Sequence, residues 1–128
     1  MAENAKRPRN YQPPRSPEEI LLRYANGERY FAETELDNCD FRNATFQDAD
    51  FSHSYFTADF RGANLKRAVF RSANVKTCDF RNADLEAADF SEAALCSTQF
   101  EGANLEGARF AGAYFHSHEM KENEKPCW

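Results

Sequence analysis

Residues 58–90 decide the fold, and they read ADFRGANLKRAVFRSANVKTCDFRNADLEAADF. A large apolar residue returns at every fifth position of this stretch, from Phe60 to Phe90. A small residue, usually Ala, stands two positions before each of them, and Asp or Asn fills most of the positions between. The same spacing extends outward to Phe31 and Phe115, with one four-residue step after Phe56.

A period of five fits neither common secondary structure, because an α-helix repeats about every 3.6 residues and a strand every two. Two inward columns, one large and one small, with turn-forming Asp or Asn beside them, indicate a chain that turns a corner in every repeat. Short repeats of constant length are typical of solenoids, whose coils stack to bury one continuous core. The pattern therefore predicts an all-β solenoid.

The repeat A-[DN]-[LF]-x-x, seen at residues 63–67 (ANLKR) and 83–87 (ADLEA), resembles the signature of the pentapeptide-repeat family. The resemblance covers about two thirds of the chain. It implies the fold of that family, a right-handed quadrilateral β-helix. Short cyanobacterial members have a similar capping helix followed by Gly-Glu-Arg, the sequence of residues 27–29 here.

Four sides per coil can be tested by assigning successive repeats to four faces in rotation, starting at Phe31. Two opposite faces then carry only Phe, provided that the four-residue step still counts as one side, and this step should tighten its corner. The predicted structural core consists of the first-face Phe31, Phe51, Phe70, Phe90 and Phe110, and the third-face Phe41, Phe60, Phe80 and Phe100. The second face is built on Leu36, Phe56, Val75, Leu95 and Phe115, and the fourth on Phe46, Leu65, Leu85 and Leu105.

A short helix is predicted before the repeats. Ser16 is a suitable N-cap, Pro17 fits the first helical position, and Glu19 completes a capping box. Because the end of a solenoid exposes apolar rings, we expect Ile20, Leu21 or Tyr24 to cover it. The predicted organisation is a disordered arm (1–15), a capping helix (16–27), the β-helix (28–117) and a C-terminal tail (118–128), in which Met120 fills a last inward site, the polar residues fray and Trp128 folds back on the coil end.

Composition indicates a single domain without membrane contact. No apolar run approaches the length of a membrane span, and the basic N-terminus lacks the apolar segment of a secretion signal. Cys39 and Cys78 occupy the small column two coils apart, roughly 10 Å at the spacing of strands, too far for a disulfide. We therefore expect reduced cysteines and a cytoplasmic location.

Residues that could carry chemistry are sparse. No Ser or Cys is matched with a His and a carboxylate, and there is no phosphate-binding loop. His116 and His118, with Cys96 and Cys127, make only a weak metal-binding pattern, because structural zinc sites use closely spaced ligand pairs. We expect no enzyme activity, no cofactor and no metal.

The charges suggest an acidic rod with a basic belt. Residues 31–120 contain fifteen Asp and Glu against eight Lys and Arg, a net charge of −7. A basic residue follows each successive inward residue in the middle of the repeats, and these form the belt together with Arg67 beside them: Arg61, Lys66, Arg67, Arg71, Lys76 and Arg81. On the third face, Asp and Arg flank Phe41, Phe60 and Phe80 and should form exposed salt bridges. An acidic rod argues against direct nucleic-acid binding.

Two functions are compatible with this pattern. The first is a non-enzymatic structural or protein-interaction scaffold that binds an unidentified protein partner. In this case we expect the chain itself to be a monomer or weak dimer. The alternative is a DNA-mimic regulator of an enzyme such as gyrase, which the resemblance allows because some members of the family inhibit gyrase in this way. The basic belt argues against the mimic, since a mimic needs unbroken negative charge, and we expect no gyrase inhibition.

The second face is the predicted docking surface, because it has only three charged residues, Glu35, Asp37 and Lys76. Interface centres lose charge and gain aromatic side chains. A merely neutral face with Ser and Thr ladders is the equally weighted alternative. The candidate docking residues are Tyr55, Thr57, Lys76, Thr77, Cys96 and Tyr114.

Overall fold

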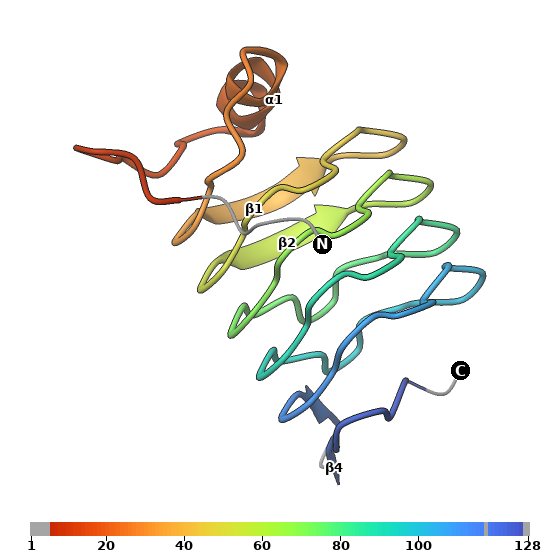
Figure 1. Ribbon diagram of the computed structural model, residues 1–128. Coiled ribbons are helices and arrows are strands. Elements are labelled where there is room, and N and C mark those ends of the chain that lie inside the picture. Colours follow the sequence, from red (N-terminus) through yellow and green to blue (C-terminus); the bar gives the residue numbers. More distant parts are fainter. Residues whose placement is uncertain (1–5, 117, 127–128) are drawn as a thin grey trace.

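The computed structural model describes residues 6–116 and 118–126 as a stack of similar coils with one helix at the N-terminal end (Figure 1). The elements are α1 (Pro17–Ala25), β1 (Glu35–Asp40), β2 (Tyr55–Asp59), β3 (Tyr114–Phe115) and β4 (His118–Glu119). β1 pairs with β2 in parallel, and isolated parallel bridges connect the later coils in the same way. The fold is the right-handed quadrilateral β-helix that the repeat predicts.

The corners explain the five-residue period. Except after Phe56, the residue two positions after each inward residue from Phe31 to Phe110 has a positive φ, from 55° at Asn38 to 74° at Gly102 and Gly112. The Asp or Asn before the inward residue supports the turn, because its Oδ1 accepts the amide two positions on, at 2.8 Å from Asp50 to Ser52. The predicted turn role of Asp and Asn is confirmed.

Asn and Gly alternate down the corner between the third and fourth faces. Its four positive-φ residues are Asn43, Gly62, Asn82 and Gly102. A Cβ added at Gly62 would lie 2.3 Å from the side-chain oxygen of Asn43, and one at Gly102 would lie 2.2 Å from that of Asn82. Each Asn side chain therefore occupies the space that the glycine of the next coil leaves.

The core consists of stacked phenylalanine columns. Third-face ring centroids are separated by 5.4, 5.0 and 5.4 Å along Phe41, Phe60, Phe80 and Phe100. First-face centroids are separated by 5.7, 5.3, 5.0 and 5.3 Å along Phe31, Phe51, Phe70, Phe90 and Phe110. All nine rings are buried. The register predicted across the four-residue step is confirmed.

Backbone hydrogen bonds of three kinds join each repeat to the next coil. The inward amide donates to a carbonyl below it, as from Phe70 to Asp89 at 2.7 Å, and the corner amide does the same, as from Ser72 to Ser91 at 2.9 Å. The carbonyl of the small inward residue accepts, as at Ala68 from the Asp89 amide at 2.9 Å. A coil without a neighbour leaves these groups unpaired.

Helix α1 closes the N-terminal end, as predicted. Ser16 Oγ accepts the Glu19 amide at 3.1 Å, but the Glu19 carboxylate accepts the amide of Arg15 rather than that of Ser16, so the capping box is displaced by one residue. Ile20 is fully buried in the core, and the Tyr24 ring packs edge-on against Phe46. Leu21 faces outward, 41% exposed. Among the described residues, no helix is long and apolar enough to cross a membrane.

The segment before α1 differs from the expected disordered arm. Residues 1–5 lie outside the described residues, but Tyr11 packs edge-on against Tyr30 and Pro14 is buried. The Tyr11 hydroxyl donates to the Ala32 carbonyl at 2.7 Å, and the Tyr24 hydroxyl does the same to the Gln47 carbonyl at 2.9 Å. Each of these carbonyls follows an inward residue and would accept a corner amide if a coil preceded it. The aromatic hydroxyls take the place of that missing coil.

The C-terminal tail also differs from a frayed end. β3 and β4 form a small antiparallel hairpin, and Met120 follows it back under the last coil. The Met120 amide donates to the Ala113 carbonyl at 2.6 Å, and the Met120 carbonyl accepts the Gly112 amide at 2.8 Å. The Met120 side chain is buried, so the predicted last inward site is confirmed. Trp128, for which we expected a contact with the coil end, lies outside the described residues.

Candidate protein-interaction face

Tyr55 and Tyr114 lie in one ladder on the second face. Parallel bridges connect Tyr55 to Asn74, Asn74 to Ala94, and Ala94 to Tyr114, so both tyrosines stand on the same line with two small or medium residues between them. They are 43% and 51% exposed. Because the backbone below them is tied to adjacent coils, the two rings project from a rigid surface.

The third face is different, because its charges are paired. Arg42, Arg61 and Arg81 each bind the Asp two residues before them, at 2.9, 2.7 and 2.6 Å. The hydrogen bonds from Arg42 lower the pKa of Asp40 to about 2. The Arg61 side chain likewise lowers the pKa of Asp59. The predicted salt bridges are confirmed.

The basic belt is largely neutralised by neighbouring carboxylates. Beyond the third-face pairs, Lys66 lies 3.6 Å from Asp84. Arg67 binds Asp48 at 2.7 Å in the coil above. Arg71 lies 3.7 Å from both Asp89 and Glu92. Among the described residues Lys76 is the belt member without an ion pair, so the belt is a weaker argument against DNA mimicry than the sequence suggested.

The four-residue step does not tighten its corner, contrary to our expectation. β1 has six residues where β2 has five, and the register shift falls between Leu36 and Cys39. Asn38 supplies the positive φ in the first coil and Thr77 in the third, but residues 55–59 run as one strand without such a residue. The step removes the corner residue, and the chain straightens.

Two threonine hydroxyls compensate for the missing corner. The Asn38 amide would normally donate to a corner carbonyl below it and instead donates to Thr57 Oγ1 at 2.7 Å. The Lys76 carbonyl would normally accept a corner amide from above and instead accepts the Thr77 hydroxyl at 2.5 Å. Thr77 does this at a φ of 63°, an unusual conformation for a β-branched residue. Both threonines therefore have a structural role at this corner.

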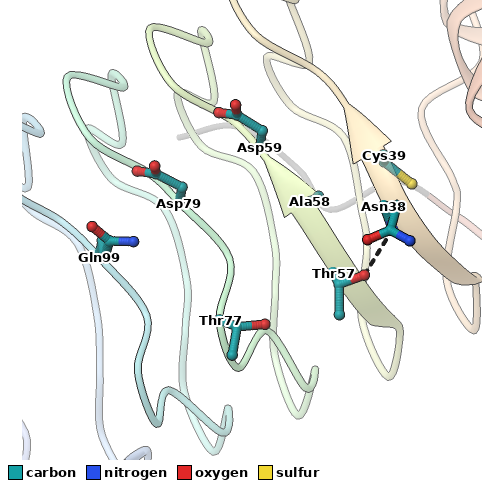
Figure 2. Close-up of a pocket in the computed structure, with 8 residues that line it drawn as sticks. All are labelled: Asn38, Cys39, Thr57, Ala58, Asp59, Thr77, Asp79 and Gln99. Carbon is teal, nitrogen blue, oxygen red and sulfur yellow. Dashed lines mark hydrogen bonds between the residues drawn. The ribbon is translucent and has the colours of Figure 1, made fainter.

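A hollow of about 440 Å³ lies at the short corner, beside the second face. Figure 2 shows Asp59, Asp79 and Gln99 in one row and the Thr57 and Thr77 side chains in another. The remaining lining residues are Asn38, Cys39 and Ala58. The hollow offers hydroxyl, amide and carboxylate groups that could hold a polar side chain of a partner.

The described cysteines provide no reactive group near this hollow. Burial raises the pKa of Cys39 to about 11 and that of Cys78 to about 12, so both thiols stay protonated at neutral pH. Cys39, Cys78 and Cys96 are free cysteines, and the Cys96 thiol donates to the His116 carbonyl at 3.5 Å. Within the described residues no group of His, Cys, Asp and Glu is arranged to hold a metal ion; Cys127 lies outside them.

The six residues predicted for docking thus divide into two groups. Tyr55, Tyr114 and Lys76 are exposed on the second face, whereas Thr57 and Thr77 complete the short corner and Cys96 is half-buried. Sequence reasoning missed the hollow. The sequence feature that could have indicated the hollow is the four-residue step together with Thr57 in the same coil and Thr77 in the next.

Comparison with known proteins agrees with this description. The family described as Pentapeptide repeat region matches residues 30–110. A pentapeptide repeat protein from Nostoc PCC 7120, alr5209, is 30% identical, with 90% of this chain and 93% of that chain covered and a TM-score of 0.43. A pentapeptide repeat protein of the Arabidopsis thaliana thylakoid lumen is 29% identical over 60% of this chain and 63% of that chain, with a TM-score of 0.41.

More distant similarity extends to QnrB1, a plasmid-mediated fluoroquinolone resistance protein. It is 20% identical, with 70% of this chain and 69% of that chain covered and a TM-score of 0.42. No curated protein sequence matches the chain. From the match over residues 30–110 and the repeated corners and columns described above, the chain belongs to the pentapeptide-repeat family.

Proposed function

We propose that this chain is a non-enzymatic scaffold that binds a protein partner through its second face. The observation that carries the proposal is the pair of half-exposed tyrosines, Tyr55 and Tyr114, on one ladder of a face with few charges. Tyrosine contributes a large contact area at low entropic cost, and charge is depleted at interface centres. A face held rigid by the coils above and below needs little reorganisation on binding.

The partner fits this face best if it brings an apolar or aromatic group between the tyrosines and a polar side chain into the adjacent hollow. Cys39, Cys78 and Cys96 are free cysteines, as is usual in a reducing compartment, so the proposal includes a cytoplasmic location. With the second face occupied by a partner, we expect the chain itself to be a monomer or weak dimer.

Quantitative affinity capture from the source organism tests the proposal. The doubly substituted Tyr55→Glu, Tyr114→Glu protein should lose its main partner at least tenfold, because two charges would be placed at the interface centre. The matched third-face control, Arg61→Gln with Arg81→Gln, should retain it within about twofold, since exposed ion pairs contribute little. Loss in the control with retention in the tyrosine protein would overturn the proposed face.

A second candidate is DNA mimicry, favoured by one observation. The ion pairs of Arg61, Lys66, Arg67, Arg71 and Arg81 mask most of the basic belt on a rod with a net charge of −7 between residues 31 and 120. A gyrase supercoiling assay separates the candidates. We still expect no inhibition at low micromolar protein, because Lys76 and the arginine side chains interrupt the negative surface; strong inhibition would favour the mimic.

A further inference from the structure

The last complete coil leaves a row of backbone groups unpaired. One coil earlier, the inward and corner amides of the fourth and first faces donate to the coil below at 2.7 to 2.9 Å; they belong to Leu85, Ala87 and Phe90. The corresponding amides at the C-terminal edge, defined here as residues 103–111, belong to Leu105, Gly107 and Phe110, and none of them has an acceptor within the described part of the chain. The carbonyls of Ala103 and Ala108 have no donor there either.

This edge borders a groove of about 360 Å³. Residues 107–111 form one wall, and tail residues Glu122, Asn123 and Lys125 form the other. Ala103 and Ala108 belong to the small inward column but are only partly buried, whereas their counterparts Ala83 and Ala88 are 2% and 0% exposed. The edge therefore combines unpaired donors and acceptors with two partly accessible alanines, whereas the large side chains of Leu105 and Phe110 are buried.

We propose that the C-terminal edge binds an extended segment of a partner protein by parallel strand addition, in the groove between the edge and the tail. Strand addition uses the backbone groups of a sheet edge for affinity and its alternating side-chain positions for specificity. By continuing the coil, the segment would place a small residue below Ala108 and large apolar residues in register with Leu105 and Phe110. Because Leu105 and Phe110 are already buried, 6% and 1% exposed, these large side chains would replace the part of the tail that covers them.

The charge at the edge specifies one further residue. On the fourth and first faces, the side chain that follows an inward residue contacts the side chain that precedes the inward residue of the next coil. Lys66 thus lies 3.6 Å from Asp84, and Arg71 lies 3.7 Å from Asp89. At the edge this outward position is Glu106, which is exposed and has no ion pair among the described residues. The incoming segment should therefore carry Lys or Arg immediately before its first apolar residue.

The same rule disfavours a second copy of this chain as the occupant. Its own repeats mostly carry Asp or Asn in that position, as at Asp84 and Asn104, so a continuing copy would place an acid or an amide against Glu106. At the N-terminal end, α1 covers the coil with Ile20. The partner is thus a foreign segment in which a basic residue precedes a large apolar one.

The probe is a seven-residue peptide, acetylated and amidated, with the sequence Lys-Leu-Ser-Gly-Ala-Ser-Phe. Added to the full-length protein at millimolar concentration, it should slow amide hydrogen exchange at least tenfold at Leu105, Gly107 and Phe110. The interior amides of Leu85 and Phe90, already bonded, should not change. The same peptide with Glu in place of Lys should protect the edge much less.

Charge reversal in the protein provides the matched control. Glu106→Lys should abolish the preference for the Lys peptide or reverse it, whereas Glu86→Lys, on the same face one coil earlier, should leave binding unchanged. The proposal is overturned if neither peptide protects the three amides, or if Glu106→Lys has no effect. It is also overturned if the amides are protected without peptide and sedimentation shows a dimer, because a second copy would then occupy the edge. This edge is separate from the second face, so either site can fail without the other.

Discussion

The two ends of the solenoid are closed by different means. At the N-terminal end, α1 places Ile20 on the core, and the hydroxyls of Tyr11 and Tyr24 satisfy carbonyls that have no coil above them. At the C-terminal end, Met120 covers part of the last coil, but the amides of the fourth and first faces have no acceptor in the described chain.

The difference between the two ends concerns the backbone groups that lose a partner where a coil is interrupted. Where a corner is missing inside the stack, Thr57 and Thr77 supply hydroxyls to the two stranded backbone groups. Where the stack begins, tyrosines do so. Side-chain hydroxyls thus repair the pattern at two interruptions, and the C-terminal edge is the place where the described residues provide no such repair.

Removing the side chains that cover the two ends should change the stability of the protein most. Ile20→Ala is expected to lower the free energy of unfolding by about 2–5 kcal/mol, because it opens a cavity at a closed end. Met120→Ala should fall near the lower limit of that range, because its end is already accessible. Leu22→Ala is the control, since that side chain is 63% exposed, and should change stability by less than about 0.5 kcal/mol. Urea denaturation gives the three values; equal losses for Ile20 and Leu22 would contradict the cap.

The Asn and Gly corner can be compared with the corner between the fourth and first faces, to which Gly107 belongs. Gly62→Ala and Gly107→Ala share the strain of a positive φ, 69° and 73°. Only at position 62 would the new Cβ collide with an Asn side chain, because at position 107 the atom nearest to the new Cβ would be 3.7 Å away. We therefore expect Gly62→Ala to be the more destabilising by about 1–3 kcal/mol. Thermal denaturation of the two proteins side by side measures the difference, and equal melting temperatures would contradict it.

Substitutions of Thr57 test whether its hydroxyl stabilises the short corner. Thr57→Val keeps the shape of the side chain but removes the acceptor of the exposed Asn38 amide, with an expected loss of about 0.5–1.5 kcal/mol. Thr57→Ser keeps the acceptor and should recover most of that stability. Chemical denaturation checks both, and a Val protein as stable as the Ser protein would show that water replaces the hydroxyl.

The smallest expected effect is a pH dependence confined to the C-terminal tail. Backbone hydrogen bonding from Lys121, with help from His118, lowers the pKa of Glu124, so its contribution is present above the ordinary glutamate pKa and is lost as pH falls through the lowered value. Hydrogen exchange at the Met120 amide should accelerate on acidification, relative to its intrinsic rate, before exchange at the Ile20 amide does. Glu124→Gln should remove this difference; a tail that loosens at the same pH in both proteins would contradict the assignment.

Much of the fold could be predicted because five-residue spacing is a local property. The Phe columns, the register across the short step, the helix at residues 17–25 and the Asp–Arg pairs all follow from positions close in the chain or from the face assignment. The roles of Thr57 and Thr77 could not be predicted from the sequence, because they depend on which backbone groups lack partners in the coils above and below.

Other differences arose from tertiary contacts that composition does not reveal. Residues 6–15 are polar and basic, but Tyr11 finds both an aromatic ring and a carbonyl on the first coil. Arg67 appeared to belong to an exposed belt, yet the stacking brings it to Asp48 in the preceding coil. The docking face at Tyr55 and Tyr114 stays a prediction.

The alternation of Asn43, Gly62, Asn82 and Gly102 has a consequence for building longer rods from this protein. Since each Asn side chain fills the space above a Gly, the translational unit at this corner is two coils rather than one. An inserted single coil would bring Asn onto Asn or Gly onto Gly at one junction, whereas an inserted pair would restore every contact. Extension of the rod, by gene duplication or by design, should therefore succeed in even numbers of coils.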